Sequence, residues 1–200
     1  MTHIDSGTII THQTLHSIQG TTVEIPHPTL LTHLQFSRFV GCPVCDLRVH
    51  ETIDRYDELV DHGIQEVVVF QSSRQAMNKR LGDAPFPLIS DPTKSLYKAF
   101  GVRTSIAAML NPKMLPAGIK GIWHYGVKLP EIRAASFILP ADFLIDSSGK
   151  VLASKYGTHY DDQWNIDELL RLAESLTSGR TQGVAVMNDA GRKSEAPSVE

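Results

Sequence analysis

Cys42 and Cys45 are the two residues whose type and spacing best suit chemistry, and Pro43 and Val44 separate them in a Cys-x-x-Cys motif. A thiolate is the form of cysteine that attacks disulfides and peroxides, and the N-terminus of a helix stabilises it. A second cysteine one helical turn later can attack the first sulfur and displace its adduct. The motif therefore predicts a nucleophile, Cys42, and a resolving partner, Cys45, that alternate between dithiol and disulfide.

The elements around the motif are predicted to bring it to a strand-to-helix junction. Residues 30–40 form a predicted strand that ends at Gly41, and Pro43 suits the first position of a helix. Apolar residues then recur on one helical face from Cys45 to Val60, and Gly63 ends the helix. Because Cys45 belongs to this apolar face, we expect it to be buried and Cys42 to be more exposed. Pro43 is expected to tune the stability of the thiolate.

The remaining pattern predicts an α/β sandwich with parallel strands first and an antiparallel hairpin last. The chain alternates short β-rich runs with segments of helical spacing. In chain order we expect a hairpin over 8–25, a strand over 64–70, a helix over 73–81, a strand over 86–89, a helix over 91–100, two strands over 141–145 and 151–154, and a helix over 165–176 with a capping box at its start.

Composition excludes several classes of protein. The 200 residues are 42% hydrophobic with a net charge of −3, so neither a basic nucleic-acid surface nor a polybasic membrane patch is expected. No apolar run is long enough for a membrane helix, the first residues do not resemble a signal peptide, and two cysteines make no disulfide framework. We expect a cytoplasmic protein with one domain over 1–177 and a flexible tail over 178–200.

Other interpretations of the two cysteines stay open. They are also compatible with ordinary core residues, or with half of a zinc site. No second Cys-x-x-Cys is present, and the closely spaced pair His12 and His16 lies upstream of the motif. The non-catalytic alternative is a redox switch or zinc clip that binds a protein partner. Nothing in the sequence calls for a metal, flavin or nucleotide as cofactor.

The segments HLQFSRFVGCPVCDLRVHE, VVVFQSS, ISDPTKSLYKAFGV and PADFLIDSSGKVLASKYG together resemble the peroxiredoxin-like branch of the alkyl hydroperoxide reductase/thiol-specific antioxidant family. The resemblance covers about residues 15–176. It implies a thioredoxin-like three-layer sandwich, a mixed sheet flanked by helices, with an added N-terminal hairpin. It also implies that Cys42 is the peroxidatic cysteine and Cys45 the resolving one. The implied activity is hydroperoxide reduction by an antioxidant enzyme, and the alternative is protein disulfide reduction. The implied reductant is an external thiol system such as thioredoxin or glutathione.

The sequence departs from the family pattern close to the motif. The family's Thr, three residues before the peroxidatic cysteine, is Phe39 here, and its Pro is Gln35. Arg38 and Arg133 are the candidates for the arginine that the family places beside the thiolate, with surface or structural roles as the alternative.

Two further positions are taken from the thioredoxin pattern. The buried acid of thioredoxins would fall at Phe36, and Asp142 is a candidate substitute, with a solvated strand-end carboxylate as the alternative. Pro140 precedes a predicted strand, where it is either a cis proline beside the motif or a trans proline that starts an edge strand.

Two other segments have candidate roles. The insertion over 102–139 is a candidate cover for the active site, a homodimer interface or additional core. The stretch from Tyr156 to Trp164 combines aromatic and polar groups and is a candidate functional loop.

Overall fold

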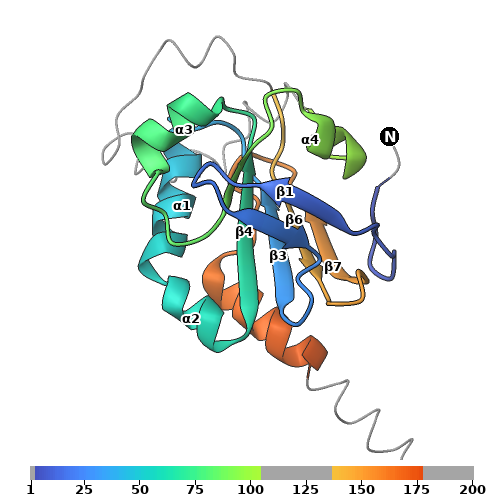
Figure 1. Ribbon diagram of the computed structural model, residues 1–200. Helices are drawn as coiled ribbons and strands as arrows, with labels where there is room; N and C mark the ends of the chain where they lie inside the picture. Colours follow the sequence, from blue (N-terminus) through green and yellow to red (C-terminus); the bar gives the residue numbers. More distant parts are fainter. Residues whose placement is uncertain (1–2, 105–136, 178–200) are drawn as a thin grey trace, which may run out of the picture.

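The centre of the computed structural model, which describes residues 3–104 and 137–177, is a five-stranded sheet in the order β5-β4-β3-β6-β7 (Figure 1). Strands β3, β4 and β5 are parallel, whereas β6 is antiparallel to both β3 and β7. The predicted order of parallel and antiparallel strands is therefore confirmed. The strands are β3 (Leu31–Phe36), β4 (Ile64–Phe70), β5 (Leu88–Ser90), β6 (Ala141–Ile145) and β7 (Val151–Tyr156).

Each face of the sheet is covered by its own set of elements. Strands β1 (Gln13–His16) and β2 (Thr22–Ile25) form the predicted hairpin, which crosses one face together with α4 (Ser95–Ala99). The other face packs against α1 (Pro43–Asp54), α2 (Tyr56–Asp61), α3 (Arg74–Leu81) and the helix over residues 166–177. Because successive side chains of a strand point to opposite faces, Leu34 and Phe36 pack under the hairpin while His33 and Gln35 face the helices. The result is a three-layer α/β sandwich.

The predicted helix after the motif is wrong beyond Asp54. The structure interrupts it at Arg55, whose φ of −117° and ψ of 18° are not helical, and α2 begins at the next residue. This interruption changes the rotational phase of the second segment, so Leu59 is buried and Val60 is 52% exposed. The guanidinium of Arg55 binds Glu58 and Asp167 at 2.7 Å each, which ties the interruption to the last helix.

Side chains cap the starts of two helices, and the cap of the last helix was predicted from the sequence. The side chain of Ser73 accepts a hydrogen bond from the backbone of Ala76 at the start of α3. The capping box of the last helix is present: the Glu168 N–H donates to Asn165 at 2.9 Å, and the Asn165 N–H donates to Glu168 at 3.1 Å. The strand predicted over 30–40 is shorter than expected, because β3 ends at Phe36.

Two predictions lie largely outside the described residues. They are the roles of the 102–139 insertion, of which 105–136 are not described, and the flexible tail over 178–200. In the part of the chain that the structure describes, no helix has both the length and the apolar character to cross a membrane.

Candidate active site

A short turn between β3 and α1 brings the motif to the carboxyl ends of the parallel strands. The backbone N–H of Gln71, just after β4, donates to the Arg38 carbonyl at 3.1 Å. Gly41 has a φ of +92°, which favours glycine, and its N–H donates to the Asp46 carboxylate at 3.0 Å. The chain thus turns into α1 with Cys42 as the N-cap residue and Pro43 in the first turn, as predicted.

Both thiols are buried in the reduced protein. Cys42 is 2% exposed and Cys45 is 3% exposed, and neither forms a disulfide. The burial of Cys45 confirms the prediction from its apolar helix face, whereas the expected exposure of Cys42 is wrong. Helical spacing did not reveal that Arg38 lies directly against Cys42.

Arg38 is the candidate arginine that the fold brings to the motif. Its Nη1 donates a hydrogen bond to Cys42 Sγ at 3.5 Å. Its Cζ lies 3.6 Å from the centroid of the Tyr160 ring and 5.2 Å from that of Phe39. Arg38 is itself buried, and within residues 3–104 and 137–177 no carboxylate forms an ion pair with it. The positive charge of Arg38 acts to lower the pKa of both thiols. Arg133 lies outside the described residues.

The electrostatics of the pair differ from the sequence expectation. Burial alone would raise the pKa of Cys45, but the hydrogen bond from Cys42 and the charge of Arg38 outweigh it and lower that pKa to about 7. The same hydrogen bond with Cys45, followed by burial, holds the pKa of Cys42 well above its usual range. These opposite shifts belong to the pair rather than to either thiol, because the two sulfurs are joined by a hydrogen bond. Helix position had suggested that the negative charge forms on Cys42 first. In the structure the hydrogen bond from Cys42, and after it the charge of Arg38, favour the charge on Cys45 instead.

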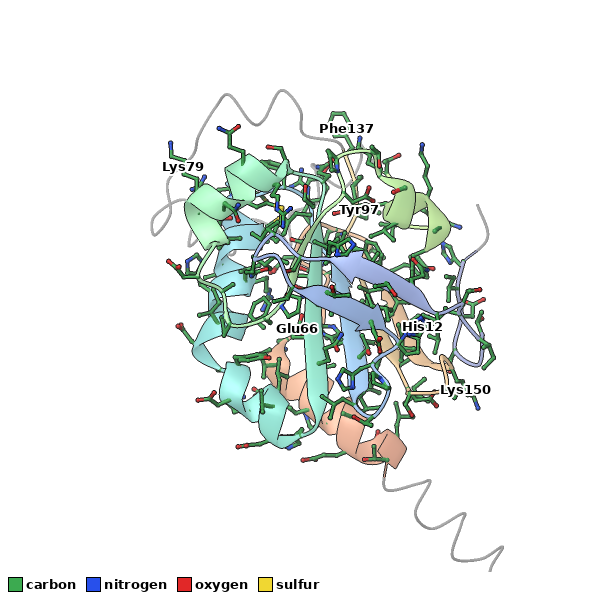
Figure 2. All side chains as sticks on the ribbon, viewed as in Figure 1. His12, Glu66, Lys79, Tyr97, Phe137 and Lys150 are labelled. Carbon is green, nitrogen blue, oxygen red and sulfur yellow. The ribbon has the colours of Figure 1, made fainter. Side chains whose placement is uncertain are left out.

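The sequence analysis missed two residues at the same strand ends. Tyr97, labelled in Figure 2, donates its hydroxyl to the carbonyls of Ser37 at 2.6 Å and Val69 at 2.9 Å, which ties the ends of β3 and β4 together. Gln71 is buried, and neither polar atom of its carboxamide has a hydrogen-bond partner among the described residues. A polar residue immediately after the apolar run of β4 was the available signal for Gln71.

Asp142 is buried in a second polar cluster, so the solvated alternative is wrong. Its Oδ1 lies 3.5 Å from His33 Nε2, and its Oδ2 accepts the Trp164 N–H at 3.2 Å. His33 Nδ1 donates to Glu66 at 2.6 Å across neighbouring strands, and Figure 2 labels Glu66 on β4. The Asp142 carboxylate thus contacts His33 and Trp164, and neither cysteine is among these partners.

The cluster of His33, Glu66 and Asp142 holds a positive charge between acids. Burial would lower the pKa of His33, but the charge of Glu66 and the hydrogen bonds of both carboxylates raise it to about 10. Burial raises the pKa of Glu66 despite the attraction of His33. The sequence signal was a strand, residues 31–36, with polar residues at alternate positions on one face.

Pro140 has neither of its two predicted arrangements. The peptide bond before it is trans, because the cis bond of the described residues joins Ile25 to Pro26. The strand that follows it, β6, lies inside the sheet between β3 and β7 and is no edge strand. Pro140 lines a pocket of about 220 Å³ with Tyr156 and Arg103, and neither cysteine is among the described lining residues.

A zinc site would need further His, Cys, Asp or Glu side chains close to the two cysteines. Among the described residues, no group of three or more His, Cys, Asp or Glu side chains converges on a point where a metal ion would be held.

The segment that forms this site also matches a known protein family. A profile of the AhpC/TSA family matches residues 30–154, which include β3 to β6 and both cysteines. The chain belongs to the AhpC/TSA family. This AhpC/TSA protein is a thiol-dependent oxidoreductase of the peroxiredoxin type. No protein of curated function matches its sequence.

Solved structures share the fold of this AhpC/TSA protein at low sequence identity. The reduced 2-Cys peroxiredoxin of Plasmodium vivax is 15% identical with a TM-score of 0.67, over 90% of this chain and 86% of that one. The AhpC of Mycobacterium tuberculosis is 18% identical with a TM-score of 0.62, over 89% and 96%. A putative thiol:disulfide interchange protein DsbE from Chlorobium tepidum is 20% identical with a TM-score of 0.54, over 85% and 99%. The predicted thioredoxin-like fold is thereby confirmed.

Proposed function

We propose that Cys42 and Cys45 form the redox centre of this AhpC/TSA protein and that the pair reduces hydroperoxides, with Cys42 as the attacking sulfur. The observation that carries the proposal is the buried guanidinium of Arg38, 3.5 Å from Cys42 Sγ and paired with no carboxylate among the described residues. A positive charge at this position stabilises the thiolate and the negative charge that develops on the departing oxygen.

The reaction begins with a proton transfer within the pair. The Cys45 thiolate accepts the proton of Cys42 through their hydrogen bond. The Cys42 thiolate then attacks the terminal peroxide oxygen, the O–O bond breaks, and the alkoxide takes a proton from solvent to leave as an alcohol. Cys42 is now a sulfenic acid.

The second step regenerates a stable oxidised centre. The sulfur of Cys45 attacks the sulfur of the Cys42 sulfenic acid, and its proton leaves with the hydroxyl group as water. Overall, one dithiol and one hydroperoxide give one disulfide, one alcohol and one water. An external dithiol of the thioredoxin or glutathione type then reduces the disulfide, which suits a reducing compartment such as the cytoplasm.

Disulfide reduction is the second candidate function, and Phe39 favours it. Phe39 occupies the position where the family carries a threonine hydroxyl, and its ring lies beside Arg38. A thiolate that lacks this hydroxyl is still able to attack a disulfide sulfur, because that reaction has no peroxide oxygen to polarise.

Intact-mass spectrometry of the reduced protein after one equivalent of hydroperoxide tests the proposal. The wild type should lose two hydrogen atoms, and the Cys45→Ser variant should gain one oxygen, trapped as sulfenic acid on Cys42. The Cys42→Ser variant is the matched control and should remain unmodified. If oxygen appears on Cys45 in this control as fast as on Cys42 in the other variant, the assignment of Cys42 is wrong.

A further inference from the structure

Arg38 is held beside Cys42 by an aromatic ring. The Cζ of its guanidinium lies over the Tyr160 ring, 3.6 Å from the ring centroid, while its Nη1 donates a hydrogen bond to Cys42 Sγ. Tyr160 and Arg38 are both buried. Tyr160 comes from the loop between β7 and the last helix, more than a hundred residues after Arg38 in the chain.

An aromatic ring and a carboxylate can each fix the position of an arginine, but they differ in their effect on its positive charge. A carboxylate fixes a guanidinium strongly, but it also neutralises the positive charge that acts on neighbouring groups. The face of an aromatic ring attracts the cation through its quadrupole and carries no net charge. Arginine is long and flexible, so a partner of this kind fixes its direction and leaves its field on the sulfur intact.

The loop that carries Tyr160 is anchored on either side of the ring. Asp161 Oδ1 pairs with Arg48 Nε of α1 at 2.8 Å. Asp162 Oδ1 pairs with Lys155 Nζ of β7 at 3.1 Å. These contacts join the loop to the helix that begins at Cys42 and to the sheet, so the ring has a fixed position relative to the sulfur.

We propose that Tyr160 is a positioning residue: its ring clamps the guanidinium of Arg38 against Cys42 Sγ and thereby keeps Cys42 reactive. The inference rests on the proposed function, in which Cys42 is the attacking sulfur. The charged or titratable groups that face Cys42 in the described structure are Arg38, Cys45 and Tyr160.

The test measures how fast iodoacetamide alkylates Cys42 at different pH values, in a Cys45→Ser background so that a single thiol reacts. Tyr160→Leu should raise the pH midpoint by about one unit, which lowers the rate below the midpoint about tenfold. Tyr160→Phe keeps the ring and should keep the midpoint. In an Arg38→Met background, Tyr160→Leu should cause no further shift, because the ring acts through the arginine.

Other outcomes would overturn the inference. If Tyr160→Leu speeds alkylation at every pH and leaves the midpoint unchanged, the ring only shields the thiol. If the shifts of Tyr160→Leu and Arg38→Met add, the ring does not act through Arg38. Circular dichroism and thermal melting check that each variant is folded.

A second variant keeps the test decisive if Tyr160→Leu does not fold. Asp161→Asn weakens the anchor of the loop and should raise the midpoint by a few tenths of a unit. The matched control is Asp167→Asn, which removes the distant ion pair with Arg55 and should leave the midpoint unchanged. An unshifted midpoint in a folded Asp161→Asn protein contradicts the proposal. Alkylation needs no peroxide, so a wild type inert to peroxide refutes the proposed function separately.

Discussion

At the carboxyl ends of β3 and β4, Arg38 faces a sulfur and an aromatic ring, whereas His33, within β3, lies between two carboxylates. Both cations are buried, His33 within β3 and Arg38 in the turn that follows this strand. Glu66 and Asp142 offset the charge of His33 and raise its pKa to about 10. No acid offsets Arg38 among the described residues, and its charge helps to lower the pKa of Cys45 to about 7.

The difference shows how the position of acids separates a structural site from a reactive one. In the His33 cluster the favourable electrostatic interaction joins the charged groups of the cluster to one another. At the thiol pair the positive charge lies beside the sulfur that changes its charge in the proposed reaction.

Removal of the attacking sulfur should have the largest effect. Cys42→Ser should abolish peroxide consumption, because serine is not a thiolate nucleophile at neutral pH. Cys45→Ser, its matched partner, should keep one rapid turnover and lose the later ones. Peroxide consumption followed over several equivalents distinguishes the two. Turnover that persists in Cys42→Ser would place the reactive sulfur elsewhere.

Disruption of the His33 cluster should lower the stability of the fold and leave the rate of reaction with peroxide unchanged. His33→Leu leaves two buried carboxylates without their cation, and we expect a loss of about 3 kcal/mol in the free energy of unfolding. Urea denaturation measures this loss, and a stopped-flow reaction with peroxide should give an unchanged rate under folding conditions. Adding Glu66→Gln removes one uncompensated charge and should restore part of the stability. Equal instability of the single and double variants would show that packing, not charge, explains the effect.

Removal of the uncompensated charge should have a moderate effect on reactivity. Arg38→Met preserves much of the buried side-chain volume and should slow peroxide attack about tenfold at pH 7, because thiolate formation moves about one unit higher in pH. Stopped-flow rates across the pH range measure this shift. Arg171→Met on the last helix is the matched loss of an arginine. If Arg38→Met reacts as fast as this control, Arg38 does not promote the attack on peroxide.

The most gradual effect concerns pH and stability. The folded pKa of His33, about 10, lies above the ordinary value of 6.5, so the folded protein keeps a proton that the unfolded chain releases. The stabilisation is complete below pH 6.5 and is lost as the pH rises through about 10, with a slope of about 1.4 kcal/mol per pH unit at most.

Comparison with His33→Gln isolates this contribution, because the thiols titrate in the same range in both proteins. The difference in unfolding free energy between the wild type and this variant should decrease as the pH rises through that window. A difference that stays constant, or that increases with pH, would contradict the assignment of His33 as the titrating group.

Local sequence patterns were sufficient for most of the framework. The apolar run of residues 64–70, the proline after Cys42 and the pairing of Asn165 with Glu168 each act through near neighbours, so spacing alone located β4, the start of α1 and the start of the last helix. The interruption at Arg55 was not visible because the apolar spacing continues to Val60, although the fold buries Leu59 instead.

The chemistry of the site depends on contacts between distant parts of the chain. Arg38 was a candidate because of its closeness to Cys42, but its stacking on Tyr160 joins segments that no local pattern relates. His33, Glu66 and Asp142 likewise meet only after three strands pair. The opposite pKa shifts of Cys42 and Cys45 likewise depend on the hydrogen bond between the two thiols and on the nearby charge of Arg38, which spacing alone does not show.

The central claim is that the thiol pair beside Arg38 attacks hydroperoxides, and stopped-flow mixing of the reduced protein with hydrogen peroxide tests it most directly. Separate mixing with a small-molecule disulfide, and with the Cys42→Ser variant, provides the comparison. We predict that two thiols are lost per peroxide, faster than with free cysteine, at a rate that rises through pH 7 and is abolished in the variant. Thiol loss with the disulfide alone, or peroxide reactivity no greater than that of free cysteine, would contradict the account.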